Sequence, residues 1–229
     1  MRVIINQPRV DKMASRTRRL MTVGLVMLVF SVFLSTNRNT IVAAYGVMLV
    51  GLVVVNIGLA IGGKYVQNPR VDQILDKVLK GLETNSRLYS LVSPADQVVV
   101  SPAGLLTLTL KPQEGQITCR GDRWSRRWTF RLLFGALFRS RLGNPTRQAQ
   151  KEAAALKKWL AARLPGTEVP IQPVIVFAHP SAELHIEQPV VPVVPLSELR
   201  AFLREHTDHR VLDQATLKTI MELFDEQAG

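Results

Sequence analysis

The stretch Asp96–Gly115, DQVVVSPAGLLTLTLKPQEG, decides the fold of the C-terminal part of this chain. Three consecutive valines at 98–100 are typical of a buried strand, and leucines alternate with polar residues over 106–111. A Ser-Pro-Ala-Gly turn separates the two runs, so the pattern predicts a β-hairpin. We expect the hairpin to hold the Asp96 carboxylate and the Lys111 ammonium on one side of a sheet.

This hairpin resembles the nuclease-related domain family, also called the NERD family. The family pattern reads as an aspartate, a hydrophobic strand, a Gly-led turn, a Glu-x-Lys motif and a closing glycine. The matching positions are Asp96, Gly104, Lys111 and Gly115. Thr109 departs from the pattern, because it stands where the family has a metal-binding glutamate. A hydroxyl is a much poorer ligand than a carboxylate for a hard divalent cation. The resemblance spans roughly Val71–Phe202.

The resemblance implies a nuclease-like site. Asp96 and Lys111 would be its catalytic residues, and Asp96 with Asp72 would bind a metal, Mg²⁺ or a similar ion; an inactive site would require no cofactor. Gln148 matches a glutamine that contributes to the site from a helix. Two alternatives remain open at the sequence level: Asp72 interacts with the dipole of its own helix, and Gln148 is a solvated residue in a first helical turn.

Strand-like and helical patterns alternate after residue 71, which predicts an α/β domain over 71–229 with a central mixed sheet flanked by helices. The expected helices are Val71–Leu82, Thr146–Leu164, Ser197–Glu205 and Asp213–Gln227. The expected strands besides the hairpin are Arg87–Val92, Val169–Ala178 and Val190–Val194, and three prolines around the last one favour an edge position.

Two uncharged apolar runs precede this domain, Leu20–Thr36 with 17 residues and Ile41–Ile61 with 21. Helices of these lengths reach about 25–30 Å, close to the thickness of a bilayer core. The sequence therefore predicts a basic leader over 1–19, a transmembrane helical hairpin over 20–63 and a linker over 64–70. Basic residues flank both outer ends of the hairpin, so we expect a multi-pass protein of the cell membrane with both termini cytoplasmic. Glycines in the spans would permit close helix packing or self-association into a homo-oligomer.

The formal net charge of +11 is unevenly distributed. Lys111–Arg163 carries thirteen basic and three acidic residues, whereas Leu164–Gly229 carries four basic and ten acidic ones. The basic segment favours polyanions, either DNA or RNA or the anionic headgroups of a lipid bilayer. The residues assigned to this binding are Arg123, Arg126, Arg127, Arg131, Arg147 and Gln148. The single cysteine, Cys119, excludes an intramolecular disulfide.

Three hypotheses follow. In the first, the chain is a membrane-anchored nuclease-like module with impaired catalysis that binds nucleic acid or acts as a scaffold. In the second, it is an active Mg²⁺-dependent nuclease that hydrolyses phosphodiester bonds with a rearranged site. In the third, it is a structural membrane-associated protein whose basic face binds lipid.

Overall fold

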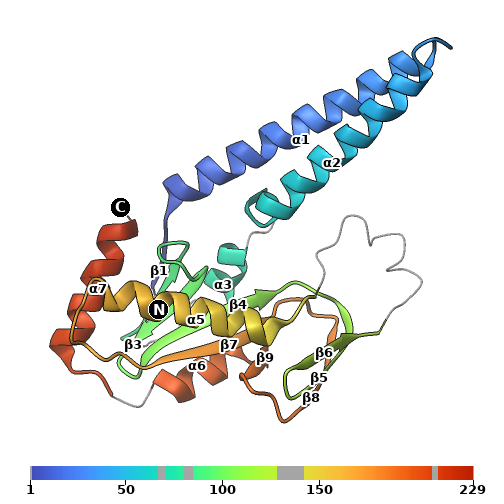
Figure 1. The fold of residues 1–229 in the computed structure, drawn as a ribbon. Helices are drawn as coiled ribbons and strands as arrows, with labels where there is room; N and C mark the ends of the chain where they lie inside the picture. The colour runs from blue at the N-terminus through green and yellow to red at the C-terminus, as the bar shows by residue number, and fades with distance from the viewer. Residues whose placement is uncertain (1, 67–70, 80–84, 128–141, 208–210, 229) are drawn as a thin grey trace. The chain divides into compact units, whose positions relative to one another are not determined.

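The computed structural model describes residues 2–66, 71–79, 85–127, 142–207 and 211–228, and it divides the chain into two compact units (Figure 1). The first unit combines Met1–Asn6 with the described residues from Val71 onward, and the described residues of Gln7–Arg70 form the second. The second unit is thus inserted between the first six residues and the remainder of the domain to which they belong.

The inserted unit is a pair of long helices, α1 (Gln7–Ser35) and α2 (Ile41–Val66). Glycines allow the two helices to approach closely. A Cβ atom added at Gly24 would lie 2.5 Å from Val55 Cγ2, and one at Gly51 would lie 3.1 Å from the Gly24 carbonyl oxygen. The turn between the helices is closed by Thr40, whose hydroxyl donates to the Leu34 carbonyl at 2.6 Å.

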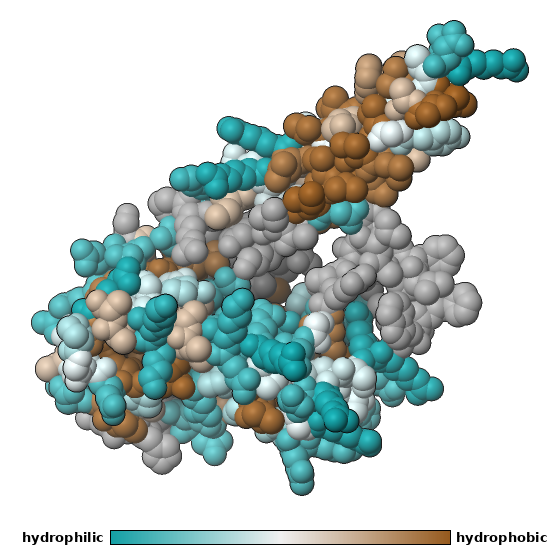
Figure 2. Space-filling model, in the orientation of Figure 1, coloured by the Kyte–Doolittle hydropathy of each residue, from teal (hydrophilic) through white to brown (hydrophobic). Residues whose placement is uncertain are grey.

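Both helices expose large apolar side chains, and Figure 2 shows a mostly hydrophobic surface along them. Phe33 is 70% exposed and Val42 is 81% exposed. Segments Asp11–Ser35 and Ile41–Leu59 are long and apolar enough to cross a membrane. Only 17% of each apolar window is buried, whereas the core helix of a soluble protein would be mostly buried.

The first unit is built on a mixed six-stranded sheet with the order β1-β2-β3-β4-β7-β9. The pairs β2–β3 and β3–β4 are antiparallel, and the other three pairs are parallel. The strands are β1 (Arg2–Ile5), β2 (Arg87–Ser90), β3 (Gln97–Ser101), β4 (Gly104–Lys111), β7 (Ile171–Phe177) and β9 (Val193–Pro195). The predicted hairpin is β3–β4, and the mixed α/β class is confirmed.

Gly104 closes the β3–β4 turn with φ of +126°, a conformation that favours glycine. A Cβ atom at this position would lie 2.7 Å from the Pro170 carbonyl oxygen, so the space also requires glycine.

Strand β1 was not predicted. It lies within the segment that the sequence analysis treated as a basic leader, yet it pairs in parallel with β2, from Arg2 with Arg87 to Ile5 with Ser90. The segment 1–19 therefore divides into an edge strand of the domain sheet and, from Gln7, the first turns of α1.

Helices cover both faces of the sheet. On one face, α3 (Val71–Leu79) and α6 (Leu199–Thr207) pack over a core that includes Leu88, Val99 and Leu106. On the other face, α5 (Pro145–Ala161) and α7 (Gln214–Ala228) pack over a core that includes Tyr89, Val98 and Leu105. This alternation of neighbouring residues between the two cores is the period of two expected for strands.

A second, three-stranded sheet with the order β6-β5-β8 was also not predicted as a separate element. Its strands are β5 (Gly115–Arg120), β6 (Arg123–Arg126) and β8 (Ala182–Glu187). Strands β5 and β8 continue the chain beyond β4 and β7 and remain parallel to each other. Trp124 packs against Phe177 with ring centroids 5.8 Å apart, in a core that also contains Ile117.

Candidate functional site

The site lies where the parallel strands β4 and β7 end, beneath α5. Thr109 pairs with Ile175 and Lys111 with Phe177 across these strands. Because Thr109 and Lys111 are two residues apart, both side chains point to the same face. The sequence predicted a polar face here, but the residues are buried: Thr109 is 2% and Lys111 is 7% exposed.

Helix α5 supplies the other half of the site, because its N-terminus is fixed beside these strand ends. The Asn144 side chain caps the helix by accepting a hydrogen bond from the Arg147 N–H at 3.0 Å, and Pro145 follows in the first turn. Gln148 and Glu152 are four residues apart, so they lie on the same face of the helix. Gln148 is exposed and Glu152 is half-buried.

Four side chains form a continuous hydrogen-bonded network between the strand and the helix. Lys111 Nζ donates to Gln148 Oε1 at 2.7 Å and also to the Leu142 carbonyl at 3.2 Å. Gln148 Nε2 donates to Glu152 Oε1 at 2.8 Å. Thr109 Oγ1 donates to Glu152 Oε2 at 2.7 Å. Each carboxylate oxygen of Glu152 therefore accepts a hydrogen bond from a neutral donor.

Burial lowers the pKa of Lys111, because an ammonium ion is less well solvated beneath the helix than in water. The negative charge of Glu152 acts in the opposite direction and favours the ammonium form. Glu152 is thus the carboxylate whose charge acts on Lys111 in the part of the chain that the structure describes.

Asp96, the predicted partner of Lys111, lies in the bend before β3 and is partly buried. Val98 pairs with Thr107 in the antiparallel β3–β4 ladder. If that register is continued by two residues, Asp96 lies opposite Thr109, which is two residues before Lys111 on β4. Asp72 is the second residue of α3, and its side chain is outside the described residues.

The donor set can be compared with what Mg²⁺ requires. No group of three or more His, Cys, Asp or Glu side chains suited to a metal occurs among the described residues. Mg²⁺, however, commonly keeps several waters and binds one or two carboxylates together with substrate phosphates. In the described part of the chain, the network itself contributes one carboxylate, that of Glu152, which accepts hydrogen bonds from Thr109 and Gln148.

The predicted anion-binding residues divide into two groups. Gln148 belongs to the Lys111 network, whereas the described arginines lie around the second sheet and the start of α5. Arg126 Nε donates to the Glu114 carbonyl at 2.9 Å, and Arg127 Nη1 donates to Gln116 Oε1 at 3.3 Å. Arg131 is outside the described residues.

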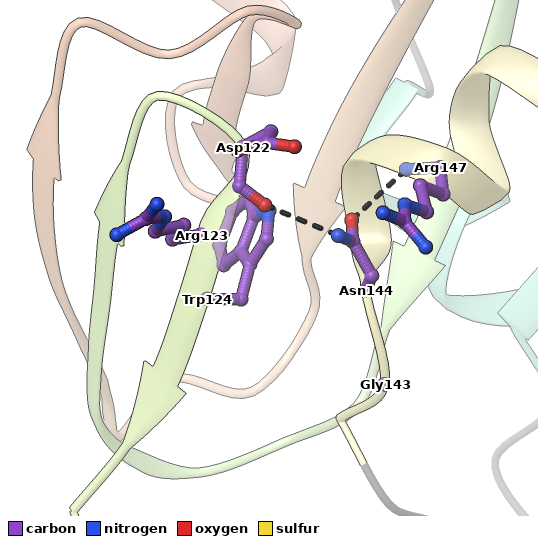
Figure 3. A pocket seen from close by; sticks show the side chains of 6 residues that line it. All are labelled: Asp122, Arg123, Trp124, Gly143, Asn144 and Arg147. Carbon is purple, nitrogen blue, oxygen red and sulfur yellow. Dashed lines mark hydrogen bonds between the residues drawn. The ribbon is translucent and has the colours of Figure 1, made fainter.

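Arg123 and Arg147 are exposed and line an open pocket of about 470 Å³ (Figure 3). The Asn144 amide closes one side of this pocket by donating to the Asp122 carbonyl at 3.1 Å. In Figure 3 the Arg123 side chain points away from Arg147, so the two guanidinium groups do not converge on one point.

Glu152 is the site residue that sequence reasoning missed. It was counted only as one of three acidic residues in a basic segment. The available signal was its spacing of four residues from Gln148, which places both side chains on one helical face. That spacing does not by itself say which strand residue the face meets.

Comparison with known families supports a nuclease-related assignment. Residues 70–178 match the family model of the nuclease-related domain, which confirms the resemblance found from the hairpin. The match includes β2 to β7 and α5, and thus the whole Lys111 network, whereas β1, the helical pair and the last two helices lie outside it. No curated protein and no solved structure matches the chain.

Proposed function

We propose that this chain is a membrane-anchored, nuclease-related protein whose domain binds the phosphodiester groups of nucleic acid at the Lys111 network and has impaired cleavage. The observation that carries the proposal is the contact between Thr109 and Glu152. A hydroxyl occupies the strand position where the family resemblance expects a carboxylate, and it is already donating to a carboxylate that comes from the helix. Metal binding at such a site is weaker than at a site with a carboxylate on the strand.

Phosphate binding is supported by the charge around the site. Lys111 provides an ammonium at the end of β4, beneath α5. The exposed Arg147 precedes Gln148 in the first turn of α5. The exposed Arg123 and Arg127 add positive charge on the second sheet. Cations spread along a surface in this way bind a phosphate backbone without reading its sequence, and such binding weakens steeply as the salt concentration rises.

Membrane anchoring is supported by the exposed apolar surface of α1 and α2 and by the course of the chain. Strand β1 precedes α1, and α3 follows α2, yet both belong to the same unit. A helical hairpin inserted in this way would cross the membrane twice, so the chain would return to the side of the membrane from which it entered. Together with the basic residues that flank the hairpin, this favours cytoplasmic termini and contact with the anionic lipid of the inner leaflet. A second copy of the chain is a further partner that the hairpin could recruit.

Glu152 and Asp96 are the described residues that would hold Mg²⁺. The bound ion would supply positive charge at a phosphate oxygen. Lys111 would contribute a fixed ammonium to the same phosphate, and Gln148 holds that ammonium in place.

An active Mg²⁺-dependent nuclease is the second candidate function, and one observation favours it. Thr109 has no carboxylate, but its hydroxyl lies 2.7 Å from a carboxylate oxygen of Glu152. A carboxylate is therefore close to the strand position where the family pattern has one.

The two candidates differ in a direct assay. The full chain, reconstituted in nanodiscs of neutral lipid, is incubated with labelled single- and double-stranded DNA and RNA, with EDTA or with Mg²⁺. We expect salt-sensitive binding that weakens in Lys111→Met and not in Lys157→Met, which removes an exposed lysine from α5. Cleavage that requires Mg²⁺ and is lost in Lys111→Met would favour the active nuclease. Retention on anionic vesicles alone, without nucleic-acid binding, would favour a structural lipid-binding protein.

A further inference from the structure

We infer that two copies of this chain associate side by side in the membrane through the outward face of α2, where the Asn56 side chain of one copy hydrogen-bonds to the Asn56 side chain of the other. The inference rests on the membrane anchoring in the proposed function, and it is independent of the Lys111 network. It assigns the surface of the hairpin to which a second copy binds. It commits to that partner because a carboxamide, which both donates and accepts hydrogen bonds, is complementary to itself.

Asn56 lies within the apolar segment of α2 and turns away from α1. The buried positions of α2 recur every seven residues, at Ala44, Gly51 and Gly58. This buried line meets α1, because a Cβ atom added at Gly51 would lie 3.2 Å from Met27 Cβ. Asn56 follows Gly51 by five residues, which turns it about 140° around the helix from that contact.

The outward face of α2 carries residues at the spacing of a coiled-coil seam. Steps of four, three and four positions join its members, which are Tyr45, Leu49, Leu52 and Asn56. Tyr45 is 61% exposed and Leu49 is 59% exposed, so α1 does not cover this seam. A single asparagine in an otherwise apolar seam determines which residues of two helices meet. The seam therefore has both the spacing and the polar residue that specify one register with a second helix.

The Asn56 carboxamide has more hydrogen-bonding capacity than its own chain uses. Its Nδ2 donates to the Leu52 carbonyl at 2.9 Å, and this is the one hydrogen bond of that side chain within the described residues. A carboxamide has two N–H donors and an accepting oxygen, so one N–H and the oxygen are left over. Thr22 and Ser31 differ, because each donates its single hydroxyl proton to a carbonyl of its own helix, at 2.9 and 2.7 Å.

The position of Asn56 along α2 makes these open groups costly in a bilayer. The apolar run ends at Ile61, five residues after Asn56, so about 8 Å of helix separates the residue from the end of the run. No water is available in the hydrocarbon core to satisfy a polar group, and an unpaired one there is strongly unfavourable. A hydrogen bond to a second helix removes that cost.

The membrane gives the two copies a common orientation. Both copies insert in the same direction, so α2 of one copy lies parallel to α2 of the other and the two Asn56 residues lie at the same depth. A two-fold axis along the membrane normal then makes the contact isologous, with each residue meeting its own equivalent. Each Asn56 donates its remaining N–H to the carboxamide oxygen of the other, and the bond to the Leu52 carbonyl is retained.

The test measures self-association of the full chain in detergent under reducing conditions. Sedimentation equilibrium should find a reversible dimer for the wild type. Asn56→Leu, which has a similar volume without the amide, should raise the dissociation constant about tenfold, the size expected from hydrogen bonds between membrane helices. Thr22→Val is the matched control, because it removes a hydroxyl that already donates to its own helix, and it should leave the dissociation constant unchanged.

Two further experiments locate the contact. The double variant Leu49→Asn/Asn56→Leu moves the carboxamide one heptad along the seam and should restore association; because it keeps the composition of α2, it decides the question if Asn56→Leu loses helix content by circular dichroism. In liposomes of neutral lipid, an oxidant should link Leu52→Cys into a covalent dimer and leave Phe33→Cys, on the exposed face of α1, monomeric. The native Cys119 is buried and is present in both variants.

The inference is overturned if the wild type is monomeric, if folded Asn56→Leu associates as tightly as the wild type, or if Phe33→Cys forms the covalent dimer and Leu52→Cys does not. Its failure is distinct from that of the proposed function, because alkaline extraction of the liposomes tests anchoring by itself. A chain that stays in the bilayer at alkaline pH and is monomeric would remove the inference alone. A chain that is extracted would remove the membrane anchoring of the proposed function, and the inference with it.

Discussion

The six residues in front of α1 should stabilise a domain from which they are separated by the whole helical hairpin. Val3 packs against the core beneath α3 and α6, and Ile4 packs against the core beneath α5 and α7. Asn6 adds two polar contacts, from its N–H to the Ser90 carbonyl at 3.2 Å and from its amide to the Gln227 carbonyl at 2.9 Å. We predict that Val3→Ala and Ile4→Ala destabilise the domain, each by loss of one apolar contact.

The magnitude follows from the carbons removed. Burial of one CH₂ contributes about 0.8 kcal/mol, so the two carbons lost from Val3 and the three lost from Ile4 would cost about 1.6 and 2.4 kcal/mol if fully buried. Both side chains are only partly buried. Halving these figures gives about 0.8 and 1.2 kcal/mol. Because the two side chains lie on opposite faces of the sheet, the double variant should lose about 2 kcal/mol.

The assay is urea unfolding of the full chain in detergent, followed by tryptophan fluorescence. Trp159 is a suitable reporter, because its ring lies 5.3 Å from that of Phe224 in the same core as Ile4. Val211→Ala is the matched control for Val3→Ala, since Val211 is 65% exposed and its truncation should cost less than about 0.5 kcal/mol. Equal stability of Val3→Ala, Ile4→Ala and Val211→Ala would refute the pairing of β1 with the domain.

Three further predictions concern the hairpin and two buried titratable groups. Gly24→Ala and Gly51→Ala should destabilise the α1–α2 pair in thermal unfolding by circular dichroism, whereas Gly46→Ala should not, because a Cβ atom there meets nothing within 4 Å. Burial lowers the pKa of Lys111, so below pH 10.5 the folded chain loses the proton of Lys111 before the unfolded chain does. The free energy of unfolding of the wild type should therefore rise with pH relative to that of Lys111→Met. A difference in stability that stays flat as the pH rises past 10.5 would contradict this. Burial raises the pKa of Tyr89 to about 12, so the free energy of unfolding should fall as the pH rises from 10 to 12. If the free energy of unfolding of Tyr89→Phe falls by the same amount, Tyr89 is not the cause.

The parts of the fold that the sequence predicted are those with strong local periodicity. The apolar runs predicted the two helices of the inserted unit, and the valine run with the alternating leucines predicted β3 and β4. Helix α5 was predicted over Thr146–Leu164 and runs over Pro145–Ala161. In each case the neighbours along the chain determine the structure, so a pattern of a few residues is sufficient.

The parts that were missed depend on partners far along the chain. The sequence RVII at residues 2–5 is too short to be recognised as a strand, and its partner, β2, begins at Arg87. Strand β8 alternates residues of intermediate exposure with exposed ones, and it is held by parallel pairing with β5, about 67 residues earlier in the chain. Such pairings leave little local signal because the register is set by the partner strand.

The same reasoning explains why the site was only half predicted. The strand motif located Lys111, and helical spacing alone would have grouped Gln148 with Glu152. The missing step was the register between α5 and β4, which determines that Glu152, rather than another residue of the helix, lies against Thr109. The strand position that lacks a carboxylate is therefore in contact with one from the helix, because Glu152 Oε2 lies 2.7 Å from the Thr109 hydroxyl. The strand motif thus predicts which strand residues lie in the site, whereas the helical residue that meets them is determined by the packing of α5 on β4.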